Sequence, residues 1–354
     1  MKIFLHTVND ERSGSDWLNF PSKIYSQFPN KPLMLVDDVK KIFDPLRNSL
    51  LQKGKVMRWL AYDEYNLEAG RIAAFYLPGA VSGQIGFFEC SNNELVAHEL
   101  FKTATLWLKA QQCQYVEGPV NFGEKDRFWG LMTDGFRTKG LYLDNFNPSY
   151  YQAFFDSFGF VPRDIIYTYR LERSSIDTEK LNAIADWSGS KIKYELKHFE
   201  WKEKTSLAAD LHSIYTASFN EEKRISHLTA GDILDMLEQM KPILNEKYCW
   251  LAFKDNNPLG FILFLQEPQM NSGGKKVKVM LKGFALAIIP SMRGKGIDVT
   301  LFRSLYRQLE SEKKEFDIYL SGINASTTKM NSLIAKAGGE KVKIHQTFIY
   351  KINL

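Results

Sequence analysis

The feature that most constrains the fold is an order of elements that occurs twice along the chain. Residues 59–62 read WLAY and residues 250–253 read WLAF, and an apolar run that begins at a glycine, Gly70 or Gly260, follows each tetrapeptide. Short apolar runs rich in aromatic and β-branched residues predict buried strands. Because the same succession returns in both halves of the 354-residue chain, the sequence predicts a tandem duplication.

Both halves continue in the same order after these strands, with a third strand, a helix, a strand, a helix that ends at a glycine, and a closing strand. In the first half these are residues 83–90, 97–112, 115–121, 148–159 and 165–171. Their counterparts in the second half are, in the same order, residues 277–289, 297–309, 317–324, the helix that ends at 338, and 343–352. This order predicts an α/β (α+β) fold class, in which two tandem domains each hold a mixed, mostly antiparallel sheet flanked by helices.

The expected domain boundaries follow from the same comparison. We expect a first domain at residues 1–172 and a second at residues 196–354. The stretch between them, residues 173–195, is polar and weakly patterned, and we interpret it as a linker.

The most chemically specific stretch is residues 282–298, KGFALAIIPSMRGKGID. Its apolar run predicts a buried strand that stops at Pro290, because proline cannot extend a strand ladder. Arg293, Gly294, Lys295 and Gly296 then precede a segment with one apolar face at helical spacing. Free backbone N–H groups at a helix N-terminus bind anions, glycine allows close approach, and basic side chains add charge. An ordinary strand–turn–helix with basic residues in the turn is the alternative interpretation.

These residues resemble the acyl-CoA motif of the GCN5-related N-acetyltransferase (GNAT) superfamily, which reads Arg or Gln, two residues, Gly, one residue, then Gly or Ala. Arg293 and Gly296 fit the motif, whereas Asp298 departs from its last position. Either the Asp298 carboxylate repels a bound pyrophosphate, or Asp298 caps the helix, where Asp is favoured.

The resemblance implies an acetyl-CoA or other acyl-CoA site in the second half. The backbone around Leu286 and Ile288 would bind the pantetheine arm, and the turn formed by Arg293, Gly294, Lys295 and Gly296 would hold the pyrophosphate. In the first half, residues 89–93 connect the third strand to its helix without a glycine, so we expect no CoA there.

The resemblance leaves the catalytic residues unassigned. Members of the superfamily often use a tyrosine in the last helix as the acid, but Phe155 and Ile334 occupy the matching positions, and neither can donate a proton. In the second half, Glu221 or His227 could act as a base, or they could lie in a plain surface loop.

An aromatic insertion distinguishes the first half. GRIAAF at Gly70, GPVNFGEKD at Gly118 and NPSYY at Asn147 resemble a group of bacterial two-domain GNAT-like proteins whose biochemical role is poorly defined. The insertion, residues 122–151, could wall a substrate pocket, or it could form an interdomain seam or a local core. For the pocket interpretation, the candidate substrate residues are Asn121, Trp129 and Tyr151.

Residue spacing, net charge and the length of apolar runs argue against a metal site, a nucleic-acid partner and a membrane span. The six histidines and three cysteines show no metal-ligand spacing, so we expect no metal site. The net charge of +5 without a long basic run makes nucleic acid an unexpected partner, and no apolar run approaches the length of a membrane span. We expect a cytoplasmic protein, and the sequence gives no oligomeric state.

The function favoured by the resemblance is an acyl-CoA-dependent N-acyltransferase that acts on a small amine by direct transfer. A non-catalytic ligand-binding protein with a degenerate GNAT fold is the first alternative, supported by Asp298, Phe155 and Ile334. A Fem-like aminoacyl transferase is the second, although such proteins would be expected to show a basic groove.

Overall fold

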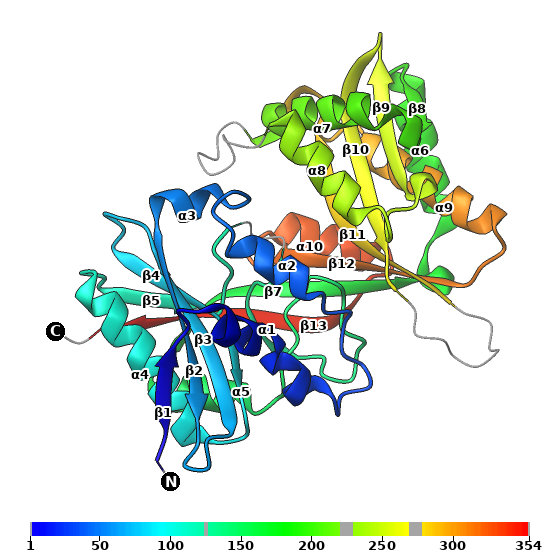
Figure 1. Cartoon of the computed structure of the whole chain (residues 1–354). Helices are drawn as coiled ribbons and strands as arrows, with labels where there is room; N and C mark the ends of the chain where they lie inside the picture. Colours follow the sequence, from blue (N-terminus) through cyan, green and yellow to red (C-terminus); the bar gives the residue numbers. More distant parts are fainter. Residues whose placement is uncertain (1, 124–126, 220–228, 269–277, 353–354) are drawn as a thin grey trace. The chain divides into compact units, whose positions relative to one another are not determined.

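The computed structural model describes residues 2–123, 127–219, 229–268 and 278–352. The chain forms two compact units. Unit 1 comprises residues 1–168, 322–328 and 341–354, and unit 2 comprises residues 169–321 and 329–340. Each unit is a sheet with helices on both faces (Figure 1).

The sheet of unit 1 has the strand order β1-β2-β3-β4-β5-β13-β7. Strands β1 to β4 form antiparallel neighbours, and β5 runs parallel to β4. The strands are β1 (Phe4–Thr7), β2 (Lys55–Tyr62), β3 (Glu68–Tyr76), β4 (Ser82–Cys90), β5 (Tyr115–Gly118), β7 (Val161–Glu172) and β13 (Glu340–Lys351), with the short β6 (Leu131–Asp134) paired to β13.

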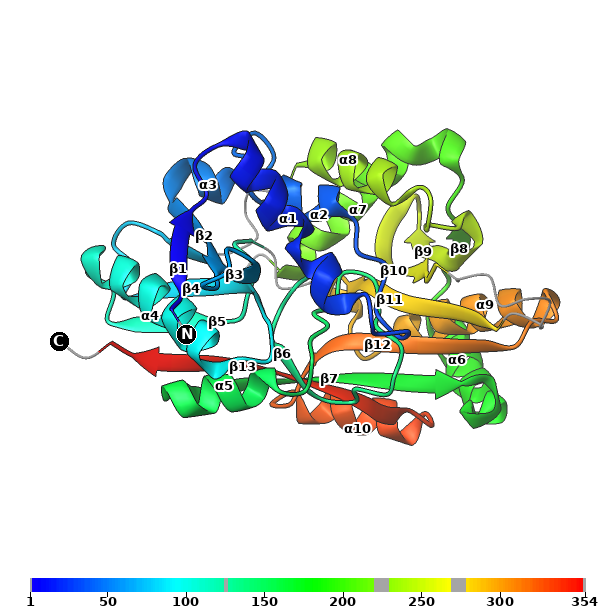
Figure 2. The same cartoon turned by 60° about the horizontal axis from the view of Figure 1, so that its bottom comes forward.

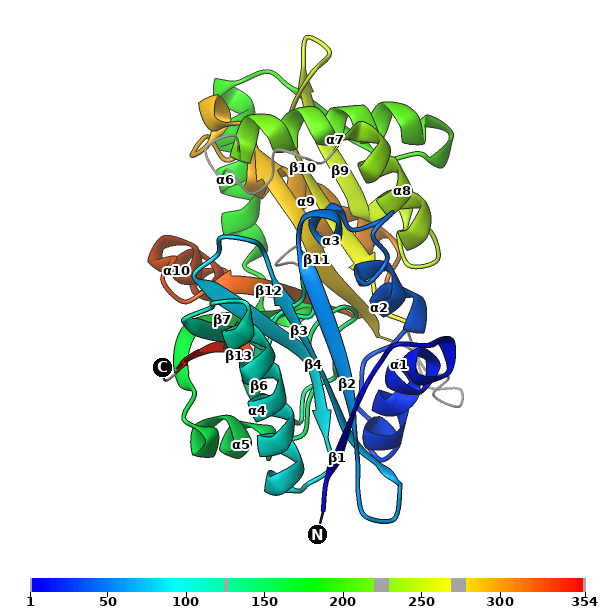
Figure 3. The same cartoon turned by 60° about the vertical axis from the view of Figure 1, so that its left-hand side comes forward.

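Helices cover the two faces of this sheet with separate cores (Figure 3). On one face lie α4 (Glu94–Ala110) and α5 (Tyr151–Phe158). Residues of α4 at helical spacing, among them Leu100 and Phe101, are fully buried there. On the other face lie α1 (Glu11–Tyr25), α2 (Val36–Ile42) and α3 (Ser49–Lys53), and Trp17 and Phe20 of α1 are buried against β3.

The sheet of unit 2 has the order β12-β11-β10-β9-β8, antiparallel except for the parallel pair of β11 and β12. Helices α7 and α8 lie on one face, and α6 and α9 on the other (Figure 2). The strands are β8 (Glu195–His198), β9 (Cys249–Lys254), β10 (Asn257–Gln266), β11 (Val279–Ile288) and β12 (Phe316–Asn324); the helices are α6 (Thr178–Lys191), α7 (Lys204–Phe219), α8 (Ala230–Met240), α9 (Ile297–Ser311) and α10 (Thr328–Lys336). Four single-turn 3-10 helices complete the described elements: Arg173–Ser175, Trp201–Glu203, Glu246–Tyr248 and Pro290–Met292.

The element order and the fold class agree with the sequence prediction, but the division of the chain differs at its end. We expected the closing strand β13 in the second domain, but its residues from Lys341 onward belong to unit 1. This strand pairs antiparallel with β5, with Phe348 opposite Gly118, and Phe348 is fully buried beside Phe155 of α5. The burial of these apolar side chains favours the pairing of β13 with β5.

The predicted linker also differs from the structure. Residues 178–191 form helix α6, which Asp177 caps by accepting a hydrogen bond from the backbone N–H of Lys180. Its sequence conceals the helix, because only Ala185 and Ser188 are buried. These small side chains allow α6 to pack closely against α9.

Candidate functional site

The turn between β11 and α9 has the geometry of an anion site. Gly294 and Gly296 both adopt positive φ angles, 72° and 77°, which only glycine accepts without strain. Gly296 is the N-cap residue of α9 and, lacking a side chain, provides no cap. Among the described residues, no acceptor binds the backbone N–H groups of residues 294–298. These donors and the helix dipole favour a negatively charged ligand.

The equivalent helix of unit 1 is closed to such a ligand. At the start of α4, the side chain of Asn93 accepts hydrogen bonds from the N–H groups of Leu95 and Val96. The first turn is therefore satisfied internally. This geometry gives a physical reason for the expectation that the first half binds no CoA.

Arg293 ties the turn to its surroundings. Its Nε donates to the carbonyl of Ile288 at 3.2 Å, and its Nη2 donates to the carbonyl of Ser218, in the last turn of α7, at 2.6 Å. The hydroxyl of Ser218 donates to the same Ile288 carbonyl at 3.1 Å. The guanidinium thus holds the ends of β11 and α7 together, and the Ile288 carbonyl is engaged.

Helix α6 supports the turn from the opposite side. A Cβ at Gly296 would lie 3.1 Å from Cβ of Ser188, so the two backbones meet closely. The hydroxyl of Tyr194 donates to Thr300 Oγ1 at 2.8 Å, and Thr300 Oγ1 donates to the Gly296 carbonyl at 3.0 Å. The segment we interpreted as a linker therefore fixes the start of α9.

Among the described residues, strand β11 has one unpaired edge next to this turn. It pairs with β12 only from Val279 to Gly283, while its pairing with β10 continues to Ile288. Phe284 is an extra residue in the ladder with β10, a β-bulge that bends the strand. Leu286, beyond the bulge, is 50% exposed. Backbone groups of Leu286 that do not face β10 are thus available to an extended ligand.

The corresponding place in unit 1 is filled. The N–H of Val120, after β5, donates to the carbonyl of Ile85 on β4 at 2.9 Å. The backbones come so close that a Cβ at Gly86 would lie 1.8 Å from the Val120 carbonyl oxygen. Phe122 then fills the space beside Phe75 and Phe87.

Asp298 lies in the first turn of α9, but it does not cap the helix, because Gly296 holds that position. Within the described part of the chain, no hydrogen bond or ion pair involves its half-buried side chain. Its carboxylate, in the first turn, therefore competes with an anionic ligand for the helix dipole.

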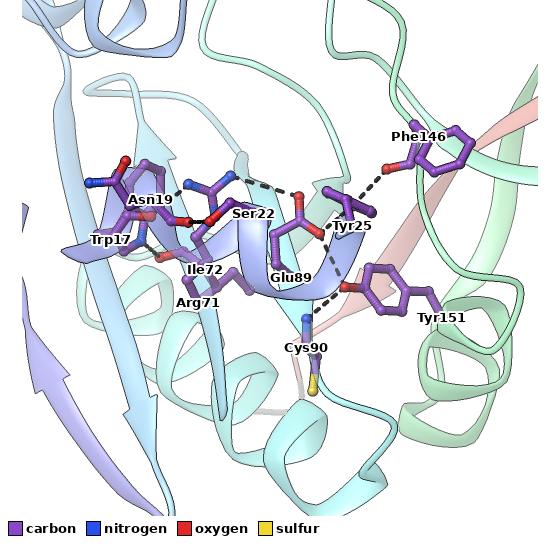
Figure 4. A network of polar contacts seen from close by, with 10 residues as sticks. All are labelled: Trp17, Asn19, Ser22, Tyr25, Arg71, Ile72, Glu89, Cys90, Phe146 and Tyr151. Carbon is purple, nitrogen blue, oxygen red and sulfur yellow. Dashed lines mark hydrogen bonds and ion pairs between the residues drawn. The ribbon is translucent and has the colours of Figure 1, made fainter. Parts of the chain in front are cut away.

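Unit 1 contains a second cluster of polar side chains, buried around Glu89 at the end of β4 (Figure 4). Tyr25 of α1 and Tyr151 of α5 each donate a hydrogen bond to Glu89 Oε2, the latter at 3.1 Å. Arg71 of β3 lies opposite Glu89, with Nη2 3.7 Å from Oε1. Burial raises the pKa of Glu89 to about 7, although Arg71 and both tyrosines favour the ionised form.

Of the three predicted substrate residues, Tyr151 lines a cavity beside Glu89. Tyr151 is fully buried and accepts a hydrogen bond from the Cys90 N–H at 2.7 Å. Asn121 is buried and donates its amide to the Arg127 carbonyl, and neither Asn121 nor Trp129 lines that cavity. The insertion contains β6, and its described residues supply part of the core and cavity walls of unit 1.

Glu221 and His227, the predicted candidates for a base, lie outside the described residues. In the part of the chain that the structure describes, no three histidine, cysteine or acidic side chains are grouped to hold a metal ion. The same residues include no helix that is both long and apolar enough for a membrane span.

Sequence reasoning missed the roles of Tyr25, Arg71 and Glu89. A signal was present, because Arg71 and Glu89 are lone opposite charges in two apolar strands that were expected to pair. Tyr25 gave no local signal, since it comes from a helix more than sixty residues away in sequence, and only the packing of α1 on the sheet brings it to Glu89.

The comparisons with known proteins concern both sequence and fold. No family model matches the chain. The chain is 19% identical over 289 residues to a protein named bacterial ceramide synthase from Caulobacter vibrioides, covering 79% of this chain and 74% of that protein.

Solved structures that resemble the whole chain include two GNAT proteins. A tandem GNAT protein from the clavulanic acid biosynthesis pathway superposes with a TM-score of 0.59 at 10% identity, covering 100% of this chain and 99% of the other. A GCN5-related N-acetyltransferase from Sphaerobacter thermophilus superposes with a TM-score of 0.52 at 11% identity, covering 99% and 96%. At these identities the likeness establishes the fold, which is tandem GNAT-like.

Proposed function

We propose that this chain, with its tandem GNAT-like fold, is an acyl-CoA-dependent N-acyltransferase. It would transfer an acyl group, from acetyl-CoA or another acyl-CoA, directly to the nitrogen of an amine. The observation that carries the proposal is the uncapped start of α9, which directly follows a strand with one free side. A cytoplasmic location is part of the proposal, since the donor is a CoA thioester.

The residues present fit the acyl donor. The N–H groups of residues 294–298, with the charge of Lys295, would hold the pyrophosphate, and the backbone around Leu286 would bind the pantetheine arm. Arg293 would act mainly by shaping the turn, because its guanidinium already binds two carbonyl groups. Asp298 opposes the fit and is expected to weaken binding rather than abolish it.

Acyl-CoA supplies the activated thioester, so the protein's task is to bind, orient and deprotonate the amine. Holding the two reactants in line supplies much of the rate. A group within hydrogen-bond reach must also take the proton that the amine loses. Phe155 and Ile334 are apolar and buried, so a proton donor at the leaving thiol has to come from elsewhere.

The acceptor is the less constrained partner. A small-molecule amine is the general expectation, and the relative named ceramide synthase favours a more specific class. A ceramide is the amide of a long-chain amino alcohol with a fatty acid. We therefore propose long-chain amino alcohols as a second class of acceptor, and longer acyl-CoAs as donors to be tested with them.

The test is calorimetric titration with CoA and acetyl-CoA, followed by measurement of thiol release with a panel of amines. We expect CoA to bind, and Lys295→Ala to weaken it, whereas Lys254→Ala, at the end of β9, serves as a control for the same charge change. Absence of CoA binding by the folded native protein would refute the proposal.

The same measurements separate the rival functions. A non-catalytic protein would bind CoA without thiol release for any amine. A Fem-like aminoacyl transferase would instead retain aminoacyl-tRNA, and the retention would fall steeply with salt.

A further inference from the structure

A cavity of about 50 Å³ lies inside unit 1, beside the buried Glu89. Tyr25, Arg71 and Tyr151 line it together with Glu89, and Phe87 and Phe146 contribute aromatic walls. Since one water needs about 10–15 Å³ of such volume, the cavity has room for about four non-hydrogen atoms. A polar cavity of this size suits a small head group.

The polar groups around the cavity include both an acceptor and a donor. Glu89 Oε2 receives two tyrosine hydroxyls, while Oε1 faces Arg71 only at 3.7 Å. Arg71 Nη1 donates to the Trp17 carbonyl at 2.7 Å, but its Nε is buried and has no hydrogen-bond partner among the described residues. A buried donor without a partner is rare in a folded protein, so Arg71 Nε can still donate a hydrogen bond to a ligand oxygen.

The charges favour a cation at the carboxylate. Glu89 presents a carboxyl group on the cavity wall, and an ammonium ion would pair with its ionised form. Aromatic rings on the walls, among them Phe87 and Phe146, offer negative faces to a cation. A ligand that carries an ammonium group for Glu89 and a hydroxyl oxygen for Arg71 Nε would match both polar groups.

The backbone around the cavity is held in unusual conformations. Phe87 and Phe128, which both line it, have φ angles of 52° and 48°, and Leu143, whose carbonyl accepts from the Phe128 N–H, has a φ of 65°. Bulky residues rarely adopt this left-handed region, and such strain concentrates where ligands are bound.

An apolar surface continues from the cavity. Met34 and Val39 belong to its lining, and Met34 lies in the run Leu33 to Val36, whose side chains are all exposed. An alkyl chain attached to a head group in the cavity would lie along these residues and remove apolar surface from water.

We propose that the cavity of unit 1 binds the head group of a primary amino alcohol that carries an alkyl chain. The ammonium binds Glu89, the hydroxyl accepts from Arg71 Nε, and the chain follows Met34 and Val39. The choice of an amino alcohol as the ligand class rests in part on the proposed function, whereas binding in this cavity does not depend on it.

Proton release is one measurable consequence. Burial raises the pKa of Glu89 to about 7, and the titratable groups that interact with it are Arg71, Tyr25, Tyr151, Tyr150 and Cys90. Asp144 lines the same cavity. An ammonium ion beside the carboxyl stabilises its ionised form, so the proton of Glu89 passes to the buffer. Calorimetry in two buffers should show nearly one proton released at about pH 6 and almost none at about pH 8.

The binding experiment uses 2-amino-1-octanol, called aminooctanol below, as the probe. Octylamine lacks its hydroxyl group, and octanol lacks its amino group. We expect aminooctanol to bind at least about tenfold more tightly than either analogue. Glu89→Gln should reduce the affinity by about tenfold or more, whereas Glu94→Gln, exposed in the first turn of α4, should leave it unchanged.

A second variant, Val39→Phe, keeps the test decisive if Glu89→Gln does not fold. Val39 lines the cavity from a partly buried position, so Val39→Phe takes up cavity space and leaves the polar cluster intact. We expect the folded Val39→Phe protein to lose aminooctanol binding. The inference would be overturned if the native protein does not bind aminooctanol at millimolar concentration. It would also be overturned if Val39→Phe binds aminooctanol as tightly as the native protein does.

The outcome is separable from that of the proposed function. Binding of aminooctanol, without thiol release from any acyl-CoA for any amine of the panel, supports this site and refutes the acyltransferase. Thiol release with other amines, without aminooctanol binding, refutes this site alone.

Discussion

Replacing Asp298 by Asn tests the placement of the acyl-CoA phosphates at the start of α9. The substitution keeps the size of the side chain and removes its charge. Asp298 lies in the first turn, half-buried and without a partner. We expect two effects of opposite sign, one on CoA affinity and one on the stability of the free protein.

The magnitudes follow from elementary electrostatics. Two unit charges about 6 Å apart repel by about 1 kcal/mol at an effective dielectric between those of protein surface and water. Asp298→Asn should therefore tighten CoA binding about fivefold. An acidic residue in the first turn also stabilises its helix through the dipole, so the free energy of unfolding should fall by about 0.5 kcal/mol.

The assay is calorimetric titration with CoA at low salt and again at about 1 M salt, where screening should remove most of the gain. Asp235→Asn, on the exposed side of α8 in the same unit, is the matched control and should change neither quantity. An unchanged or weaker affinity of Asp298→Asn at low salt would mean that the phosphates do not bind at this helix.

Three further predictions concern stability. Gly294 and Gly296 both have positive φ, but only at Gly296 would an added Cβ also meet Ser188. Gly296→Ala should therefore lower the free energy of unfolding by about 2 kcal/mol, and Gly294→Ala by about 1 kcal/mol. Thermal denaturation measures both changes. The pKa of Glu89 in the folded protein, about 7, exceeds its ordinary value of 4.5, so the folded protein binds one more proton than the unfolded chain between these pH values. The free energy of unfolding should therefore fall by at most about 3 kcal/mol as the pH rises from 4.5 to about 7. Denaturant titrations of Glu89→Gln should show a flatter dependence on pH. Arg293→Met, which loses two hydrogen bonds to carbonyl groups at an exposed site, should cost about 1 kcal/mol, and an unchanged melting temperature would contradict the tethering role.

The element order was predictable because it is encoded locally. Period-two and period-3.6 patterns mark strands and helices, and glycine and proline mark their ends. The turn at residues 293–296 was found in this way, since Gly296 starts a helix whose apolar face is visible in sequence. The boundaries of β11 and α9 differ from the expectation by only one or two residues.

The less regular segments escaped prediction for identifiable reasons. Helix α6 was read as a linker because its buried face consists of small residues, which carry little hydrophobic signal. The aromatic insertion is visible in the sequence, but its described part includes the strand β6, which pairs with a strand from the other end of the chain.

The sequence by itself thus determined which segments become strands and helices, and where a glycine turn opens a helix N-terminus. Only the tertiary structure decided that β13 pairs with β5, and that Tyr25, Arg71, Glu89 and Tyr151 meet around one cavity. The physical reason is that local patterns fix which side chains avoid water, whereas the choice of partner depends on the free energy of contacts between residues far apart in the chain.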